Sequence, residues 1–202
     1  MPARRSESGA LAEAGASAES DADGPLLIRV GRGDVVAFRT LVDRHLTSLL
    51  RIAQRMLNED PEAEDVAQEA MLRLWRSAST LEIGAGGVRP WLRRVVSNLC
   101  LDRIRSARRV ELTDAVPEQE VVASQLHCLV EVERSARVDA ALKALPERQR
   151  LALTLFHYEG LSQGEVGEIL GVSQEAVESL LARARRALKA SLQADWRQLL
   201  SE

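Results

Sequence analysis

The sequence predicts an all-α protein made of two small helical domains. Its 202 residues are rich in Ala, Leu, Arg and Glu, which favour helices, and only 3% are aromatic, which is few for a β-sandwich. Apolar residues recur with helical spacing, and no segment has the alternation of a strand. Residues 111–130 lose this spacing and are acidic. We therefore expect domains at 26–110 and 131–202, joined by a flexible acidic linker at 111–130 and preceded by a disordered polar tail at 1–25.

Three helices are expected in the first domain. Residues 34–57 place apolar side chains on one face of a helix. After a break at 58–60, Asp60 is the expected N-cap and Pro61 the first residue of a second helix, which ends near Ser77. A Gly-rich loop at 79–88 leads to a third helix from about Pro90 to Arg108.

The second domain contains a helix-turn-helix pattern. Helical spacing returns at 131–144, and a helix that starts at Pro146 is expected to end at Tyr158, before Gly160. Ser162 and Glu165 have the spacing of a capping box, which opens a short helix ending at 170–171. Ser173 is the expected cap of a further helix of about four turns. Two helices joined by a tight turn with Gly are typical of DNA-binding proteins, although a plain helical hairpin is the alternative.

The net charge of −3 is distributed unevenly along the chain. Residues 26–110 carry fifteen Arg against ten acidic residues, whereas 1–25 and 111–136 are acidic. Seven Arg and one acid lie between Arg89 and Arg109, and four basic residues lie between Ala182 and Lys189. These stretches favour contact with nucleic acid over a merely solvated helix face.

The second helix of the helix-turn-helix is the expected major-groove reader. Two sets of side chains on it are candidates, those that reach base edges and those that neutralise phosphates. They are Gln174, Glu175, Glu178 and Ser179 for bases, and Arg183 and Arg186 for phosphates. Two acids on such a face are unusual, because Glu accepts from cytosine but repels phosphate.

Other features leave more than one interpretation open. Trp91, inside the basic stretch, is suited equally to stacking on an unpaired strand and to packing in the core. The acidic helix over 59–69 either complements its own dipole or docks a basic protein partner.

No catalytic or metal-binding constellation is found in the sequence. His127–Cys128 has no spaced partners for a metal, so no metal, cofactor or catalytic residue is expected and the protein is not expected to be an enzyme. Cys100 and Cys128 are expected to be free thiols. The chain has no secretory signal and no span long enough for a membrane, so we expect a cytoplasmic protein.

Three ordered blocks resemble the sigma factors of bacterial RNA polymerase, in the extracytoplasmic function (ECF) group of the sigma-70 family. The first block is 63–69 with Leu72 and Trp75, and the second is 89–105. The third is 145–162, with 170–173 and 182–185. The resemblance covers roughly residues 30–190.

The resemblance implies a region 2 at 26–110 and a region 4 at 131–202, with three binding surfaces. The residues it implies for docking on the β′ clamp helices of core RNA polymerase are Asp65, Gln68, Glu69, Leu72 and Trp75. Those it implies for opening and holding the minus-10 element are Ser79, Thr80, Arg89, Trp91, Arg94, Asn98, Asp102, Arg103 and Arg105. Those it implies for binding the minus-35 element are Ser173, Gln174, Glu175, Glu178, Ser179, Arg183 and Arg186.

The resemblance further implies contact with the polymerase β flap and promoter DNA, and silencing by an anti-sigma factor. Gly167 stands where the family usually has Ala, and Glu178 and Leu180 stand where basic residues are common. Minus-35 contacts are therefore expected to be fewer or different. The alternatives are a helix-turn-helix regulator that binds duplex DNA without polymerase, and a helical adaptor that binds only protein.

Overall fold

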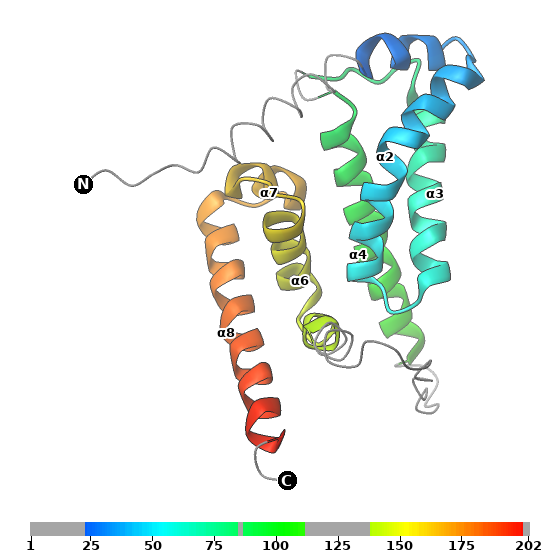
Figure 1. Ribbon diagram of the computed structural model, residues 1–202. Helices are drawn as coiled ribbons and strands as arrows, with labels where there is room; N and C mark the ends of the chain where they lie inside the picture. The colour runs from blue at the N-terminus through cyan, green and yellow to red at the C-terminus, as the bar shows by residue number, and fades with distance from the viewer. Residues whose placement is uncertain (1–22, 85–86, 112–137, 200–202) are drawn as a thin grey trace.

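The computed structural model describes residues 23–84, 87–111 and 138–199, and these are helical with no strand among them (Figure 1). The first bundle contains α2 (Val35–Met56), α3 (Asp60–Ser77) and α4 (Arg89–Glu111). The second contains α6 (Glu147–Leu153), η1 (Thr154–Tyr158), α7 (Gln163–Leu170) and α8 (Gln174–Leu199). The prediction of an all-α fold is confirmed, while residues 1–22 of the tail, 112–137 of the linker, and His127 and Cys128 lie outside the described residues.

Side-chain capping explains where α2 begins but not where α3 begins. The carboxylate of Asp34 accepts hydrogen bonds from the backbone N–H of Val36 and Ala37, at 2.9 and 3.0 Å, and so starts α2. The prediction that Asp60 caps α3 is wrong. Glu59 is the N-cap and makes no side-chain capping bond. The Asp60 carboxylate does not cap the helix and instead accepts from the amide of Gln54 at 3.4 Å.

A helix over residues 23–30 packs on α2 and begins inside the segment that composition assigned to the tail. The carboxylate of Asp23 is buried and accepts from Arg44 Nη1 at 3.0 Å, and its other oxygen lies 2.9 Å from His45 Nε2. Burial alone would raise the pKa of Asp23, but hydrogen bonds and charge from His45 and Arg44 hold it below its ordinary value. The ionised carboxylate thus anchors this helix to α2.

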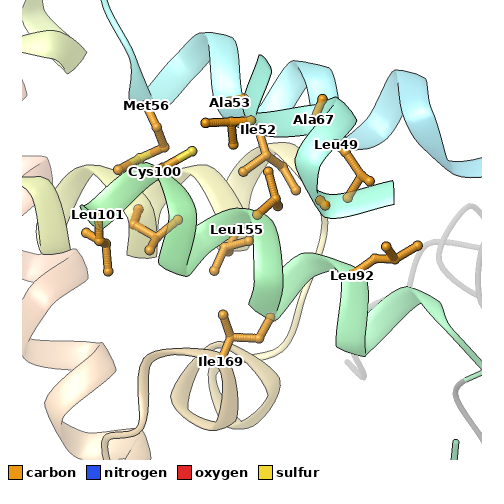
Figure 2. Close-up of a cluster of buried hydrophobic side chains, with 14 of the residues drawn as sticks. Leu49, Ile52, Ala53, Met56, Ala67, Leu92, Cys100, Leu101, Leu155 and Ile169 are labelled. Atoms are coloured by element: carbon orange, nitrogen blue, oxygen red, sulfur yellow. The ribbon is translucent and has the colours of Figure 1, made fainter. Parts of the chain in front are cut away.

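One continuous hydrophobic core joins the two bundles (Figure 2). Helices α2 and α3 pack on each other and on α4, and α6 and α7 approach α4 from the second bundle. Leu92 on α4 and Leu155 on η1 are fully buried within this cluster, together with Ile52 on α2. Each such side chain contributes about 1.5–3 kcal/mol by burial, so α4 is stabilised from both sides.

The second bundle follows the predicted order, with one local difference. The helix expected over 146–158 exists, but its last five residues form a π-helix, η1. The capping box of Ser162 and Glu165 is present, and the left-handed Gly171 ends α7 with φ 64°. Ser173 Oγ accepts from Ala176 N at 3.3 Å at the start of α8. Helix α8 is longer than predicted, at 26 residues, because residues 174–199 contain no Gly or Pro.

The turn between α7 and α8 requires a glycine at position 167. A Cβ placed there would lie 2.7 Å from the backbone oxygen of Val172, which is closer than real contacts allow. The turn therefore passes so close to α7 that position 167 has no room for a side chain.

Gly167→Ala is accordingly expected to destabilise the protein by about 1–3 kcal/mol through overpacking, although Ala favours helices. Urea denaturation followed by circular dichroism measures the change. The matched control is Gly164→Ala in the same helix, where a Cβ meets nothing closer than Ser162 Oγ at 3.9 Å. A Gly167→Ala protein as stable as Gly164→Ala would contradict this interpretation.

Candidate nucleic-acid interface

The outer face of α8 presents every residue predicted to read duplex DNA. Val177, Leu181 and Ala184 are buried against α6 and α7, so the opposite side of the helix is open. All seven candidates are exposed, namely Ser173, Gln174, Glu175, Glu178, Ser179, Arg183 and Arg186. Helix α8 lies on the side of its bundle away from α2, α3 and α4 (Figure 1), so its outer face is free to enter a groove.

The charge on this face is mixed. The backbone N–H at the start of α8 and the Ser173 hydroxyl hold the pKa of Glu175 below its ordinary value. Glu175 is therefore ionised at neutral pH and can only accept hydrogen bonds. Arg183 and Arg186 lie two to three turns further along, where they can reach phosphates.

A second exposed stripe runs along α4. Arg94, Asn98, Asp102 and Arg105 are all exposed and recur at spacings of four and three residues, so they share one side of the helix. Arg105 Nη1 lies 3.8 Å from the carboxylate of Asp102. The α4 stripe, as these four residues are called below, combines two cations and an amide with one carboxylate, which Arg105 faces, so its net charge of +1 and its amide suit a nucleic-acid backbone.

The remaining minus-10 candidates lie around the stripe rather than on it. Arg103 is turned toward Glu62 on α3, at 3.9 Å. Arg89 is half-buried and has an interaction of its own. Ser79 and Thr80 are exposed after α3, and Ser79 lines a hollow with Leu27 that is separate from the stripe. The structure therefore brings together four of the nine predicted residues in one row.

Trp91 lies at the edge of a pocket of about 260 Å³. Its ring is half-buried and packs against the core, so one part of it is structural. The same residue lines the pocket together with Arg94 from α4 and Glu168 and Ile169 from α7. The two interpretations of Trp91 are thus compatible, since a ring fixed by the core can still offer a surface for stacking.

A third surface lies on α3. Asp65, Gln68 and Leu72 are exposed on one face, and Leu72 keeps 44% of its surface accessible although it is apolar. Glu69 is half-buried and pairs with Arg73 at 3.0 Å. Trp75 packs edge-on against Phe38, with ring centroids 5.0 Å apart, and so supports this face from behind.

Sequence reasoning missed the residues that join the two bundles. Arg93 belongs to the basic stretch of the sequence, but its guanidinium donates to the carboxylate of Glu159 at 3.0 Å. Arg150 is 7% exposed and donates to the backbone oxygen of Met56 at 2.7 Å. A helical wheel separates Arg93 from the exposed Arg94, but no local pattern identifies partners that lie 66 and 94 residues away.

Among the described residues, we find no metal-binding group, no membrane-spanning helix and no reactive cysteine. They contain no group of three or more His, Cys, Asp or Glu able to hold a metal ion. None of their helices has the length and hydropathy needed to cross a membrane. Burial raises the pKa of the Cys100 thiol to about 12, so this cysteine is unreactive at neutral pH.

Comparison with known proteins decides the family. Sigma-70 region 2 matches residues 41–110, and Sigma-70, region 4 matches residues 135–188. The ECF RNA polymerase sigma factor SigM of Mycobacterium tuberculosis is 36% identical over 169 residues, which cover 82% of each chain. The chain belongs to the ECF sigma factors. The ECF sigma factor SigW of Bacillus subtilis is 30% identical, covering 81% of this chain and 93% of SigW.

Solved sigma factors share the fold of this ECF sigma factor. CnrH, in complex with the cytosolic domain of CnrY, matches with a TM-score of 0.63 and 30% identity, over 86% of this chain and 99% of CnrH. The sigma factor RpoE of Bartonella quintana, in complex with the anti-sigma factor NepR, matches with a TM-score of 0.64 and 25% identity, over 80% and 99% of the two chains. The predicted family is confirmed, and these relatives are transcription factors rather than catalysts.

Proposed function

We propose that this ECF sigma factor binds core RNA polymerase through α3, opens the minus-10 element with α4 and reads the minus-35 element with α8. The observation that carries the proposal is that one chain exposes all three surfaces on two bundles of the sigma-70 type. A repressor that binds duplex DNA alone needs no unpaired-strand surface and no polymerase-docking face. In this proposal the chain acts through the free energy of binding and carries out no bond-making step. Its place of action is the cytoplasm, where bacterial transcription takes place.

Each surface has a chemical role. The α4 stripe holds the backbone of the unpaired strand, while Trp91 offers a flat ring to a base. On α8, Arg183 and Arg186 fix the helix on the phosphates, and the ionised Glu175 accepts from a cytosine amino group. Melting is unfavourable by a few kcal/mol per unstacked step, which these contacts offset once polymerase has positioned the DNA.

An anti-sigma factor is proposed as the regulator. The structural relative RpoE is bound to the anti-sigma factor NepR, and this chain shares its fold over 80% of its length. Such a partner would cover the polymerase-binding or DNA-binding surfaces, and co-purification of the chain from its own cells would identify it.

Reconstitution with core RNA polymerase tests the proposed function. Purified chain and core enzyme are expected to transcribe a subset of genomic promoters from defined start sites, while the chain alone gives no gel shift with the same duplexes. Tight duplex binding without polymerase would favour the regulator instead. No promoter-specific transcript across a genomic library would overturn the proposal.

Leu72→Ser is expected to weaken binding to core polymerase about tenfold, because burying an exposed leucine side chain at an interface contributes about 1.5–3 kcal/mol by the hydrophobic effect, and a tenfold change in affinity corresponds to about 1.4 kcal/mol. Leu72 is 44% exposed, so its replacement leaves the fold intact. Biolayer interferometry with core enzyme measures the affinity. Ile28→Ser is the matched control, since Ile28 is 60% exposed and lies outside the proposed face. Equal affinities for the two variants would remove Leu72 from the docking surface.

A further inference from the structure

The helix over residues 23–30, called the 23–30 helix below, is firmly fixed to the first bundle. At its start, the buried carboxylate of Asp23 accepts a hydrogen bond from Arg44 Nη1 on α2 at 3.0 Å. Towards its end, Leu27 and Val30 are buried in the hydrophobic core. Because a charged hydrogen bond and close packing both resist displacement, this helix is a rigid support for whatever it touches.

Gly31, which follows this helix, lies in a turn whose backbone is hydrogen-bonded. The N–H of Gly31 donates to the carbonyl of Leu27 at 2.9 Å, and the N–H of Asp34 donates to the carbonyl of Arg29 at 3.1 Å. Gly31 is not among the described glycines with positive φ, so a residue with a side chain could adopt the same backbone angles. The backbone conformation therefore does not explain why position 31 is glycine.

A close approach to the end of α3 does explain it. A Cβ placed on Gly31 would lie 3.0 Å from Ser79 Cα, and 3.1 and 3.2 Å from the carbonyl oxygen and carbon of Ala78. All three are backbone atoms, so no side-chain rotation could relieve the contact. The 23–30 helix lies at the end of the first bundle where α3 gives way to the following loop (Figure 1), and at Gly31 the two segments touch.

The start of the loop is the side of this contact that can move. Ser79 and Thr80 are exposed, and Leu81 and the 23–30 helix line an open hollow of about 380 Å³. The N–H groups of Thr80 and Leu81 both donate to the carbonyl of Ser77, at 3.0 and 2.9 Å, and hold the loop to the end of α3. A displacement at Ser79 would therefore carry Thr80 with it and strain these two hydrogen bonds.

Ser79 and Thr80 are two of the residues that the family resemblance assigns to the minus-10 element. A hydroxyl group selects a base through a hydrogen bond, whose strength depends steeply on distance and angle. An added Cβ at Gly31 requires Ala78 and Ser79 to give way by a few tenths of an ångström. That shift is enough to change which base edge the two hydroxyls meet, although Gly31 itself faces α3 and not the DNA.

We propose that Gly31 is a positioning residue for promoter selection: the rigid 23–30 helix touches the backbone of Ala78 and Ser79 through it, and so sets the place of the Ser79 and Thr80 hydroxyls at the minus-10 element. The inference rests on the proposed function, because it takes these hydroxyls to face promoter DNA. It adds to that function a determinant of base preference that lies outside the three proposed binding surfaces.

The first measurement uses the full chain alone and the variant Gly31→Ala. In amide NMR spectra the resonances of Thr80 and Leu81 are expected to shift, and their hydrogen exchange to become about tenfold faster, because the bonds to the Ser77 carbonyl are strained. Gly164→Ala is the matched control, since it adds the same methyl group where a Cβ meets nothing closer than 3.9 Å. It is expected to leave both amides unchanged.

The second measurement uses holoenzyme, reconstituted from core RNA polymerase and the full chain, on a promoter library randomised over the minus-10 element. For Gly31→Ala, the ratio of transcripts from the preferred base to those from the other bases is expected to change about fivefold at one or more positions. Gly164→Ala is expected to keep the ratios of the unaltered chain. A mere loss of stability would lower transcription from every promoter equally, so the ratios distinguish positioning from folding.

A variant of the loop itself makes the result decisive. Ser79→Ala removes one of the two hydroxyls and is expected to change base preference at the same promoter positions as Gly31→Ala. Changes at different positions, unshifted amides, or shifted amides with unaltered base preference would each overturn the proposal. Failure of the proposed function is a separate result, because the unaltered chain would then transcribe from no promoter in the library. If only this inference fails, the unaltered chain selects promoters and Gly31→Ala selects the same ones.

Discussion

Replacing Arg94 and Arg105 together by Glu is expected to slow open-complex formation about 100-fold, because two phosphate contacts are lost and two repulsions take their place. Both residues are exposed on the α4 stripe, so the substitutions do not disturb the core. The rate is measured with polymerase holoenzyme on a promoter that carries a fluorescent base in the minus-10 element. A promoter that is already unpaired over this element is expected to retain part of the defect, since capture of the strand as well as melting is affected.

The matched control reverses two arginines elsewhere in region 2. Arg39 and Arg51 are exposed on α2 and lie outside the three proposed surfaces. Their joint replacement by Glu changes the net charge equally and is expected to alter the rate less than about threefold, because exposed charges away from the DNA are screened by salt. If both pairs slowed open-complex formation equally, the effect would come from the overall charge of region 2 and not from contacts of α4 with DNA. Binding to core polymerase is expected to be unchanged for either pair.

Features that depend on neighbouring residues could be predicted from the sequence. The capping box of Ser162 and Glu165 and the cap at Ser173 are formed by residues three positions apart, and each is present. The exposed faces of α3, α4 and α8 likewise follow from helical spacing. At Asp60 the same reasoning failed, because Gln54 from the preceding helix competes for the carboxylate that was expected to cap α3.

Features that join distant parts of the chain could not be predicted. Arg93 and Arg94 are adjacent in a run of basic residues, yet one is buried against Glu159 and the other is exposed on the stripe. The partner of Arg93 lies 66 residues away, and that of Asp23 lies 22 residues away. Composition does not distinguish these two arginines. Only the packing of α4 between the two bundles determines that Arg93 forms a structural ion pair while Arg94 stays exposed on the α4 stripe.

Arg150→Met is expected to lower the free energy of unfolding by about 3 kcal/mol, because three carbonyl groups, two of them in buried hydrogen bonds, lose their donor at roughly 1 kcal/mol each. Arg150 donates to the backbone oxygens of Met56 at 2.7 Å, Leu145 at 3.3 Å and Lys143. No carboxylate pairs with it among the described residues. Its charge is instead stabilised by carbonyls at the ends of α2 and of the helix over residues 138–143, where the helix dipoles are negative.

Urea denaturation followed by circular dichroism measures this loss, and two variants separate its causes. Arg150→Lys keeps the charge but not the planar fork, so it should restore about half of the lost stability by reaching one or two of the carbonyls. Arg148→Met is the matched control two residues away: Arg148 is exposed and donates once, to the backbone oxygen of Leu170 at 3.1 Å, and its loss should change stability by less than about 1 kcal/mol. Because the Met56 carbonyl belongs to the first bundle and the other two to the second, Arg150 also joins the bundles. A loss at Arg150 no larger than that at Arg148 would mean that the desolvation of the guanidinium cancels all three hydrogen bonds.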